Sequence, residues 1–418
     1  MLRRFPRTVL GVLLLINILG YIDRTMLLGF SPQITEDIDL NNTQFGFLSG
    51  AVWVFSYSIM VLVLGSMADR FSRTRIIAGG MLIWSICTVL SGLAQNFEQM
   101  AMARFMVAAG EAALVPSAMA LIADLFDGRH RSTANGLFFM GIPIGVGLSY
   151  LLSGTVGAEF GWRHTFMGLG VVGIVIATCL WFAKDDGGGA DAEHGEAFLP
   201  QMKAILAELR AQPALCFAIA GFVLIHLVYA QNSFVQLWLV RELGAQEATI
   251  AKQIGLLQIA FGCIGAVGGG IAADRLAKGS RLRLAAFPLL SLLICLPLML
   301  LGRFADLGSP LLYIGLAASF FLPFSVYGST LSLIQGSVPH SMRASIIGFT
   351  MMCLNVVAIA LGTVLLGVSS DWLAAHQHAN PLQTVLVASD LLVGLAILCF
   401  LLTVRAVARV RGLEPASA

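Results

Sequence analysis

Long apolar segments alternate with short polar stretches along almost the whole chain. A helix needs about 20 apolar residues to cross the roughly 30 Å of hydrocarbon in a bilayer, and twelve segments approach or exceed that length. They lie at residues 8–30, 45–67, 76–94, 99–122, 134–155, 165–183, 213–236, 249–272, 284–301, 310–335, 345–367 and 382–404. The pattern predicts an all-α integral membrane protein with twelve transmembrane helices.

The composition supports a membrane protein. Of 418 residues, 58% are hydrophobic and 11% are charged, whereas about 25% are charged in an ordinary soluble domain. The mean hydropathy is +0.86. The net charge of +2 gives no indication of a nucleic-acid partner. The seven cysteines are scattered through apolar segments, which is typical of small buried side chains and not of disulfides or metal ligands.

The longest polar stretch, residues 184–196, lies between the sixth and seventh apolar segments. The segment after it carries Ile205, Leu206 and Leu209 at a helical spacing, which predicts a short amphipathic helix on the membrane surface. We therefore expect three parts: an N-terminal six-helix bundle at 1–184, a cytoplasmic linker at 185–212 and a C-terminal six-helix bundle at 213–418.

The distribution of lysine and arginine predicts the orientation in the membrane. The two termini, the linker and the even-numbered loops together hold 19 basic residues, whereas the opposite side holds 4. Cytoplasmic loops carry the excess of Lys and Arg. Both termini are therefore expected in the cytoplasm, and we expect the membrane to be a bacterial inner membrane.

Two short motifs recur in the same order in each half. The loop at residues 65–75 resembles the loop at 270–281, and Asp69 and Asp274 are 205 residues apart. A second pair, at 131–136 and 343–348, recurs at an offset of 212 residues. Transporters built from structural repeats show such symmetry. The two bundles are therefore expected to be pseudo-symmetric.

These motifs resemble those of the major facilitator superfamily, and the resemblance covers nearly the whole chain. Its loop signature is a Gly, three residues, Asp-Arg and a further basic cluster, although Ser72 stands where the family usually has Gly. The matching positions are Gly65, Asp69, Arg70 and Arg73 in the loop, Arg104 and Gly110 in the fourth span, and Gly141, Pro143 and Gly145 in the fifth. The resemblance implies the major facilitator fold.

Within that superfamily, three segments resemble the spinster group. They are residues 21–24, 110–126 and 142–150, and the last of them ends at Tyr150. The spinster group implies proton-linked movement of lipids such as sphingolipids or lysophospholipids. Organic-anion symporters of the superfamily can carry a first-span motif similar to 21–24, so that segment alone does not separate the two groups.

The charged loop motifs favour a gating role. Aspartate and arginine on a tight cytoplasmic turn can pair with each other and with a neighbouring helix terminus, forming a latch that breaks when the bundles rock. An ordinary positively charged cytoplasmic loop would carry similar residues. The gating candidates are Asp69, Arg70, Arg73, Asp274 and Arg275, with Asp124 and Arg131 as partners.

Few ionisable residues lie within the predicted spans, and such residues usually face a cavity or one another. Arg104 and Glu111 are seven residues apart and share one helix face. Counting the rise along each helix, Asp23 and Arg104 lie at similar depth. A carboxyl group that alternates between dry and wet surroundings can bind and release a proton. We therefore expect Asp23 and Glu111 to couple transport to protons, the alternative being a permanent ion pair with Arg24 or Arg104.

The remaining polar and aromatic residues in the spans are candidates for substrate binding. The planar fork of Arg24 suits a phosphate or carboxylate group. A polar first half and an aromatic second half would suit an amphipathic substrate, although aromatic residues in spans often only pack helices or face lipid. The candidates are Arg24, Arg104, Tyr150, His226, Tyr229 and Asn355.

Three functions remain open from the sequence. The first is a proton-coupled secondary transporter of lysolipid or sphingoid amphipaths, whose partners are that substrate, protons and membrane lipids. The second is a proton-coupled symporter of a small organic anion. The third is a membrane receptor that has lost transport. The chain has no P-loop, HExxH or GxSxG motif, so we expect no enzyme activity, catalytic residue, cofactor or metal.

Overall fold

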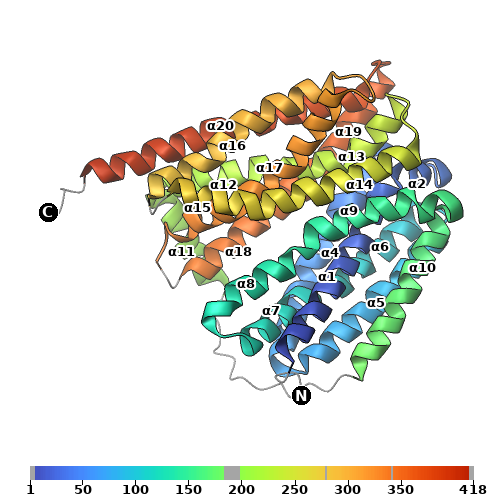
Figure 1. Ribbon diagram of the computed structural model, residues 1–418, viewed down its shortest axis with the longest axis horizontal. Helices are drawn as coiled ribbons and strands as arrows, with labels where there is room; N and C mark the ends of the chain where they lie inside the picture. The colour runs from blue at the N-terminus through green and yellow to red at the C-terminus, as the bar shows by residue number, and fades with distance from the viewer. Residues whose placement is uncertain (1–4, 183–197, 278–279, 340–341, 414–418) are drawn as a thin grey trace. The chain divides into compact units, whose positions relative to one another are not determined.

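The computed structural model describes residues 5–182, 198–277, 280–339 and 342–413 (Figure 1). Within these ranges the regular structure is helical, and twelve helical runs are long and apolar enough to cross a membrane. This confirms the predicted fold class. Residues 185–197 of the predicted linker lie outside the described residues.

Six of the twelve runs are single helices, and six are interrupted. The single helices are α1 (Pro6–Gly29), α5 (Arg73–Leu93), α10 (Val156–Trp181), α16 (Arg281–Arg303), α17 (Pro310–Gln335) and α20 (Pro381–Leu413). In three of the interrupted runs a break of one or two residues separates two helices: α6 (Phe97–Glu111) from α7 (Leu114–Leu125), α8 (Gly128–Phe139) from α9 (Gly141–Gly154), and α12 (Pro213–Ile225) from α13 (Leu227–Arg241). The other three contain a π-helical segment: α3 (Asn42–Gly46), η2 (Phe47–Ala51) and α4 (Val52–Arg70); α14 (Glu247–Ile264), η3 (Gly265–Gly269) and α15 (Gly270–Ala277); and α18 (Arg343–Cys353), η5 (Leu354–Leu361) and α19 (Gly362–Ala375). Two further helices, α2 (Ser31–Asp37) and α11 (Phe198–Ala211), are not spans.

The chain forms two compact units. The first comprises Met1–Glu193 and Leu239–Ile259, and the second comprises His194–Trp238 and Ala260–Ala418. Within the first unit, Arg241 donates to Thr35 Oγ1 at 2.7 Å and to Asn42 Oδ1 at 3.0 Å. The predicted boundaries at 184 and 213 remain a prediction.

Polar caps and prolines fix where several spans begin. Asn41 accepts a hydrogen bond from the backbone N–H of Gln44, whose side chain in turn accepts from the N–H of Asn41. This reciprocal capping box satisfies backbone donors that the first turn of a helix leaves unpaired. Asn96 caps α6 through Gln99 in the same position. Pro6 begins α1, where its missing N–H costs nothing.

Glycines allow close helix contacts in the first unit. A Cβ atom on Gly110 of α6 would lie 2.6 Å from the carbonyl oxygen of Gly80 on α5. On Gly145 of α9 it would lie 2.6 Å from Cβ of Tyr21 on α1. Membrane helices pack through such small residues because lipid supplies no hydrophobic force between them. The two contacts hold α1 and α6 close to their neighbours, and the charged residues lie on these two helices.

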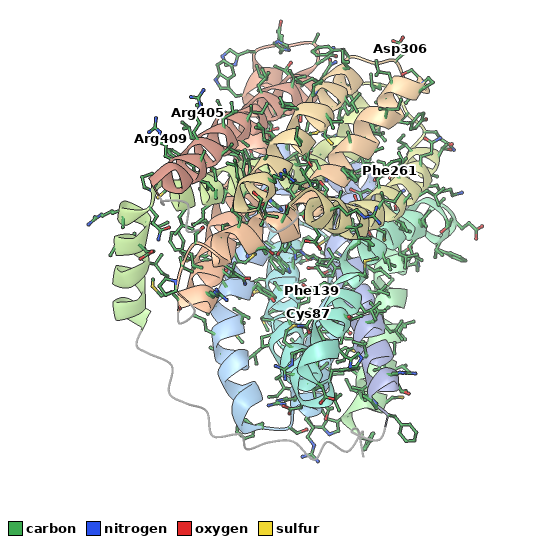
Figure 2. The ribbon with its side chains drawn as sticks, turned by 60° about the vertical axis from the view of Figure 1, so that its left-hand side comes forward. Cys87, Phe139, Phe261, Asp306, Arg405 and Arg409 are labelled. Carbon is green, nitrogen blue, oxygen red and sulfur yellow. The ribbon has the colours of Figure 1, made fainter. Side chains whose placement is uncertain are left out.

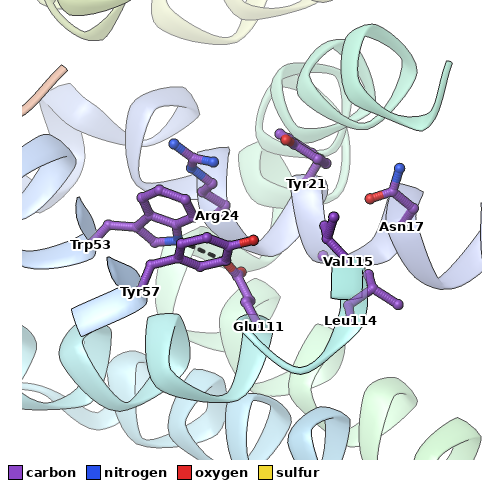
Figure 3. A pocket seen from close by; sticks show the side chains of 9 residues that line it. Asn17, Tyr21, Arg24, Trp53, Tyr57, Glu111, Leu114 and Val115 are labelled. Atoms are coloured by element: carbon purple, nitrogen blue, oxygen red, sulfur yellow. Dashed lines mark hydrogen bonds between the residues drawn. The ribbon is translucent and has the colours of Figure 1, made fainter. Parts of the chain in front are cut away.

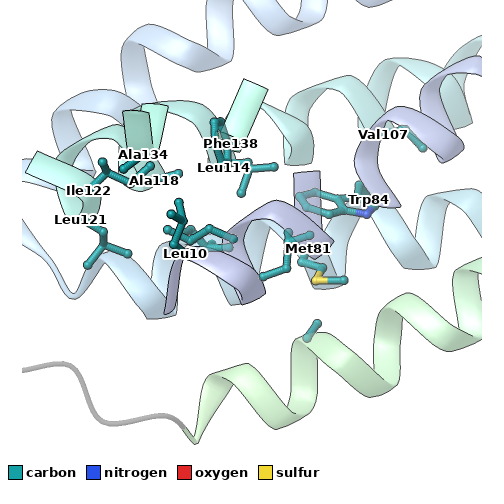
Figure 4. Packing of buried hydrophobic residues seen from close by; sticks show 14 of the residues in the cluster. Leu10, Met81, Trp84, Val107, Leu114, Ala118, Leu121, Ile122, Ala134 and Phe138 are labelled. Carbon is teal, nitrogen blue, oxygen red and sulfur yellow. The ribbon is translucent and has the colours of Figure 1, made fainter. Parts of the chain in front are cut away.

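Each unit has its own apolar core. In the first unit, Leu10 and Ile16 of α1 pack with Met81 and Trp84 of α5 and with Phe138 of α8 (Figure 4). A second cluster joins α12, α16, α17 and α20 around buried leucine, valine and phenylalanine side chains. Well-packed cores resist deformation, so each set of helices provides a firm support for polar side chains.

Helix α11 and the end of α20 lie on the predicted cytoplasmic side. In α11, Ile205 is buried in a cluster with helices of the second unit and Leu209 packs against it; a position of this helix on the membrane surface stays a prediction. At the far end of α20, Arg405 and Arg409 are exposed and point away from the helix (Figure 2). Four residues apart, they share one face.

Candidate functional site

The first unit contains an ion pair enclosed between spans. Arg104 Nη1 on α6 lies 2.9 Å from Asp23 Oδ1 on α1, and each side chain is less than 5% exposed. Thr88 of α5 donates to the other oxygen of Asp23. Arg104 also donates through Nη2 to the backbone oxygens of Asp23 at 3.2 Å and Arg24 at 3.1 Å. The two predicted partners therefore meet, and both oxygens of Asp23 are hydrogen-bonded.

Glu111 lies apart from that pair, at the end of α6 where the fourth span is interrupted. Its Oε2 accepts a 2.7 Å hydrogen bond from the indole N–H of Trp53 on α4. Its Oε1 is buried and has no hydrogen-bond partner among the described residues. Such an oxygen is costly unless a proton, a water or a ligand satisfies it.

Glu111 lines a small cavity of the first unit. The cavity has a volume of about 50 Å³ and is bounded by α1, α4, α6 and α7 (Figure 3). Its walls are formed by Asn17, Gly20, Tyr21, Arg24, Trp53, Tyr57, Glu111, Leu114 and Val115. At about 10–15 Å³ for each water, the cavity suits a few waters or one small polar group.

The guanidinium of Arg24 stacks on an aromatic residue of the same cavity. Its Cζ lies 3.3 Å from the centroid of the Trp53 ring and 5.7 Å from that of Tyr21. The Tyr57 ring stacks on Trp53 with centroids 4.4 Å apart. The structure therefore brings Arg24 and Glu111 to one cavity through Trp53, while Arg104 is occupied by Asp23. Sequence analysis missed Trp53 and Tyr57, whose only signal is their spacing of four residues in the second span.

Two candidates of the second half, His226 and Tyr229, lie at the break in the seventh span, and the third, Asn355, lies in the eleventh. His226 separates α12 from α13, is fully buried, and bonds through Nδ1 to the backbone oxygen of Phe222 at 2.6 Å. Its ring lies 5.2 Å from that of Tyr229 and 5.7 Å from that of Tyr327. Asn355 is half-buried on η5. The predicted pair of His226 and Tyr229 is therefore brought together within the second unit.

Tyr150 is buried on α9 of the first unit and is not among the residues that line the cavity. A role for Tyr150, Arg104 or Asn355 in substrate binding stays a prediction.

A second buried ion pair was not predicted. Arg303 Nε at the end of α16 lies 2.9 Å from Asp390 Oδ2 near the start of α20, and both side chains are almost completely buried. Gln231 of α13 accepts from Arg303 at 3.4 Å and donates to Ser389 at 2.9 Å. Arg303 is the last residue of α16, and Asp390 lies in the first third of α20.

The gating candidates are only partly described. Arg73 forms an ion pair with Asp124, as predicted, and Arg131 donates to the backbone oxygen of Ala123 at 2.8 Å. Asp274 and Arg275 are exposed on α15. Asp69 and Arg70 end helix α4, but their side chains lie outside the described part of the structure.

Comparison with known proteins identifies the family. The family model described as Major Facilitator Superfamily matches residues 13–363. The chain belongs to the Major Facilitator Superfamily. It is therefore a membrane transporter, as the loop and span motifs predicted.

The relatives of this transporter include members of the spinster group. It is 26% identical to Protein spinster of Drosophila melanogaster over 88% of its length, which corresponds to 63% of that protein. An MFS-type efflux pump of Mycolicibacterium smegmatis is 28% identical over 94% of this chain and 92% of its own. The fold is similar to the crystal structure of a bacterial homologue of the human lysosomal transporter spinster, with a TM-score of 0.83, 22% identity, and 96% and 98% of the two chains covered. The transporter is therefore related to spinster.

Proposed function

We propose that this transporter is a proton-coupled carrier of amphipathic, lipid-like substrates of the lysolipid or sphingoid type, working by alternating access. The observation that carries the proposal is the cavity of the first unit. There, one oxygen of the buried carboxyl of Glu111 has no hydrogen-bond partner among the described residues, and the cation of Arg24 lines the same space. An ionisable side chain inside a membrane span costs free energy, and such residues usually mark functional sites.

Glu111 is the better placed of the two coupling carboxyls to exchange a proton. Both oxygens of Asp23 are occupied by Arg104 and Thr88, so a proton there must compete with an ion pair. A proton that binds Oε1 of Glu111 displaces no ion pair or hydrogen bond among the described residues. Glu111 also lines a cavity that is large enough for water. In this scheme Glu111 takes up the proton, and Asp23 holds Arg104 and the first helix in position.

The substrate class rests on the chemistry of each unit and on the spinster resemblance. Arg24 can bind a phosphate or carboxylate with its planar fork. In the second unit, Phe222, Tyr229 and Tyr327 surround His226 and form an aromatic surface, which favours an apolar chain. The chemistry of the two units, taken separately, favours a substrate class with one anionic end and one apolar end.

A small organic anion is the second candidate, and Arg24 in the cavity favours it equally. A cavity of about 50 Å³ holds a carboxylate more readily than a bulky headgroup, unless the site widens during transport. A receptor without transport activity is the third candidate, and the unpartnered oxygen of Glu111 counts against it. We further propose that both termini are cytoplasmic, in a bacterial inner membrane, and that the Arg73–Asp124 ion pair belongs to a cytoplasmic latch.

Flux into proteoliposomes tests the proposal. Purified transporter would be reconstituted with an imposed pH gradient, and uptake of lysophosphatidylcholine, a phosphorylated sphingoid base and galactonate would be compared, with Glu111→Gln as the matched variant. We expect gradient-dependent movement of one of the two lipids and none in the variant. Galactonate movement alone would favour the organic-anion symporter. An absence of flux for every probe, together with unchanged binding, would favour the receptor.

A further inference from the structure

Trp53 contacts both functional groups of the cavity, and it does so with two different parts of its side chain. The edge of the indole donates its N–H to Glu111 Oε2 at 2.7 Å. The face of the ring lies 3.3 Å from the guanidinium carbon of Arg24. The side chain is buried between these two partners. Figure 3 shows the hydrogen bond from Trp53 to Glu111 as a dashed line and Arg24 beside the Trp53 ring.

Both contacts depend on charge. A hydrogen bond from an N–H to an ionised carboxylate is roughly twice as strong as one to a neutral acceptor. A guanidinium over the face of a tryptophan is attracted by the ring quadrupole, most strongly when water is excluded. Trp53 therefore holds an anion on its edge and a cation on its face at the same time. If the charge of Glu111 or of Arg24 changes, Trp53 is held less firmly, and its contact with the other residue is altered too.

We propose that Trp53 is a positioning residue that transmits the protonation state of Glu111 to Arg24. This inference rests on the proposed proton coupling and assigns the part that connects it to the substrate. When a proton binds Glu111, the carboxylate loses its charge and the bond to the indole N–H weakens. Trp53 is then free to shift, and the Arg24 guanidinium loses a fixed support and can turn toward an anionic group of the substrate.

The groups that face Glu111 come from three helices, and among the described residues only Trp53 donates a side-chain hydrogen bond to it. The described titratable or charged groups near it are Tyr21, Asp23 and Arg24 on α1, Tyr57 on α4 and Arg104 on α6. Asp23 and Arg104 form a pair with each other. The indole N–H of Trp53 therefore donates the hydrogen bond that Glu111 accepts among the described residues. Its removal should change the proton affinity of Glu111 directly.

The first test removes the N–H but keeps an aromatic face. In a background whose seven cysteines are replaced, spin labels at the exposed positions His130 and Leu276 would report the conformational equilibrium across pH. Because the N–H stabilises the ionised carboxylate, Trp53→Phe should move the midpoint of the pH transition upward by about one to two units. An unmoved midpoint in a folded Trp53→Phe protein would overturn the proposal.

Trp162 provides a matched control in the same unit. Its indole N–H donates to Asp37 at 3.0 Å, its side chain is buried, and the guanidinium of Arg163 lies 4.3 Å from its ring centroid. The chemistry is the same, but the site lies away from the cavity. Trp162→Phe should leave the pH midpoint unchanged. An equal shift in both variants would show that the effect is a general result of losing a tryptophan.

A double-mutant cycle tests the link to Arg24. Trp53→Leu removes both contacts and Arg24→Ala removes the cation. If Trp53 connects Glu111 and Arg24, the shift in the pH midpoint that Arg24→Ala causes should be at least halved in the Trp53→Leu background. Additive shifts would contradict the connection, since independent sites add.

A measurement on the unmutated protein covers the case in which variants fail to fold. With ¹⁵N-labelled tryptophan, the indole N–H resonance of Trp53 should move over the same pH interval as the spin-label distance. The resonance of Trp162 should not follow that interval. If the distance changes with pH while the Trp53 resonance stays constant, the positioning role fails but proton coupling stands. If neither changes, the proposed function itself fails.

Discussion

The guanidinium of Arg104 binds both a side chain and the backbone of α1, with Nη1 2.9 Å from Asp23 Oδ1 and Nη2 3.2 Å from the carbonyl oxygen of the same residue. One arginine of the fourth span therefore fixes both the carboxylate and the backbone of the first span. Because Thr88 of α5 binds the same carboxylate, three helices meet at one charge. The pair acts as a structural support for the cavity that lies beside it.

Breaking this pair should be expensive. Arg104→Gln leaves Asp23 buried without its cation, and the loss of one partner of a buried ion pair costs about 3–5 kcal/mol. The variant should therefore melt at a markedly lower temperature in detergent. The double variant with Asp23→Asn should recover part of that loss because no charge is then left unpaired. Asp37→Asn is the control, since the Asp37–Arg163 pair is partly exposed and such pairs contribute at most about 1 kcal/mol.

The buried pair of the second unit allows a complementary prediction. Asp390→Asn should destabilise the protein by about 3–5 kcal/mol because Arg303 keeps its charge. Replacement of both residues by Arg303→Met and Asp390→Leu should restore stability to within about 1 kcal/mol of the original protein, since apolar substitutes of similar volume are often neutral. Thermal unfolding of the two variants compares them directly. A double variant as unstable as the single one would indicate that Gln231 and Ser389 need the charges to stay paired.

The spans were predictable, but the contacts of single side chains were not. The length and hydropathy of each segment define a span, and the rise along a helix placed Asp23 and Arg104 at one depth. Trp53 could not be found in this way, because Phe55 in the same helix is exposed and sequence alone does not fix the rotation of a helix that is apolar all round. Arg303 and Asp390 were missed for a related reason. A charge near the end of a span can point to water or back into the bundle, and only packing decides.

The close contact between α5 and α6 predicts a sharp difference between two glycines. A Cβ on Gly110 would lie 2.6 Å from the Gly80 oxygen and 2.8 Å from the Trp84 nitrogen, whereas one on Gly168 would meet nothing within 4 Å. Gly110→Ala should therefore cost about 1–3 kcal/mol through overpacking. Gly168→Ala should be neutral or stabilising by about 0.5–1 kcal/mol, because alanine favours a helix. Equal melting temperatures for the two variants would mean that α5 and α6 separate without cost.

The ion pair between Arg73 and Asp124 predicts a modest effect on gating. Asp124 is 45% exposed and Arg73 is 11% exposed, so the pair contributes at most about 1 kcal/mol. Arg73→Ala should change the ratio of conformations by up to about fivefold, as measured with the labels at His130 and Leu276, and should leave substrate affinity within each state nearly intact. Arg75→Ala removes the same charge from an exposed neighbour and is the control. If both variants shift the ratio equally, the effect is that of net charge and not of a latch.

The final prediction concerns the two coupling carboxyls. Asp23→Asn and Glu111→Gln each imitate a protonated carboxyl, since they remove the charge and nearly keep the shape. If protons drive the cycle through these groups, the double variant should lose its response to pH between about 5 and 8. At the upper end of this range it should adopt the distribution that the original protein shows at the lower end. The single variants should differ, because Glu111 has an unpartnered oxygen and Asp23 has none. We expect Glu111→Gln to abolish most of the response and Asp23→Asn chiefly to lower stability by releasing Arg104. A full response in a folded double variant would exclude both carboxyls as the coupling groups, and His226, buried in the second unit with Nε2 unpartnered among the described residues, would be tested next.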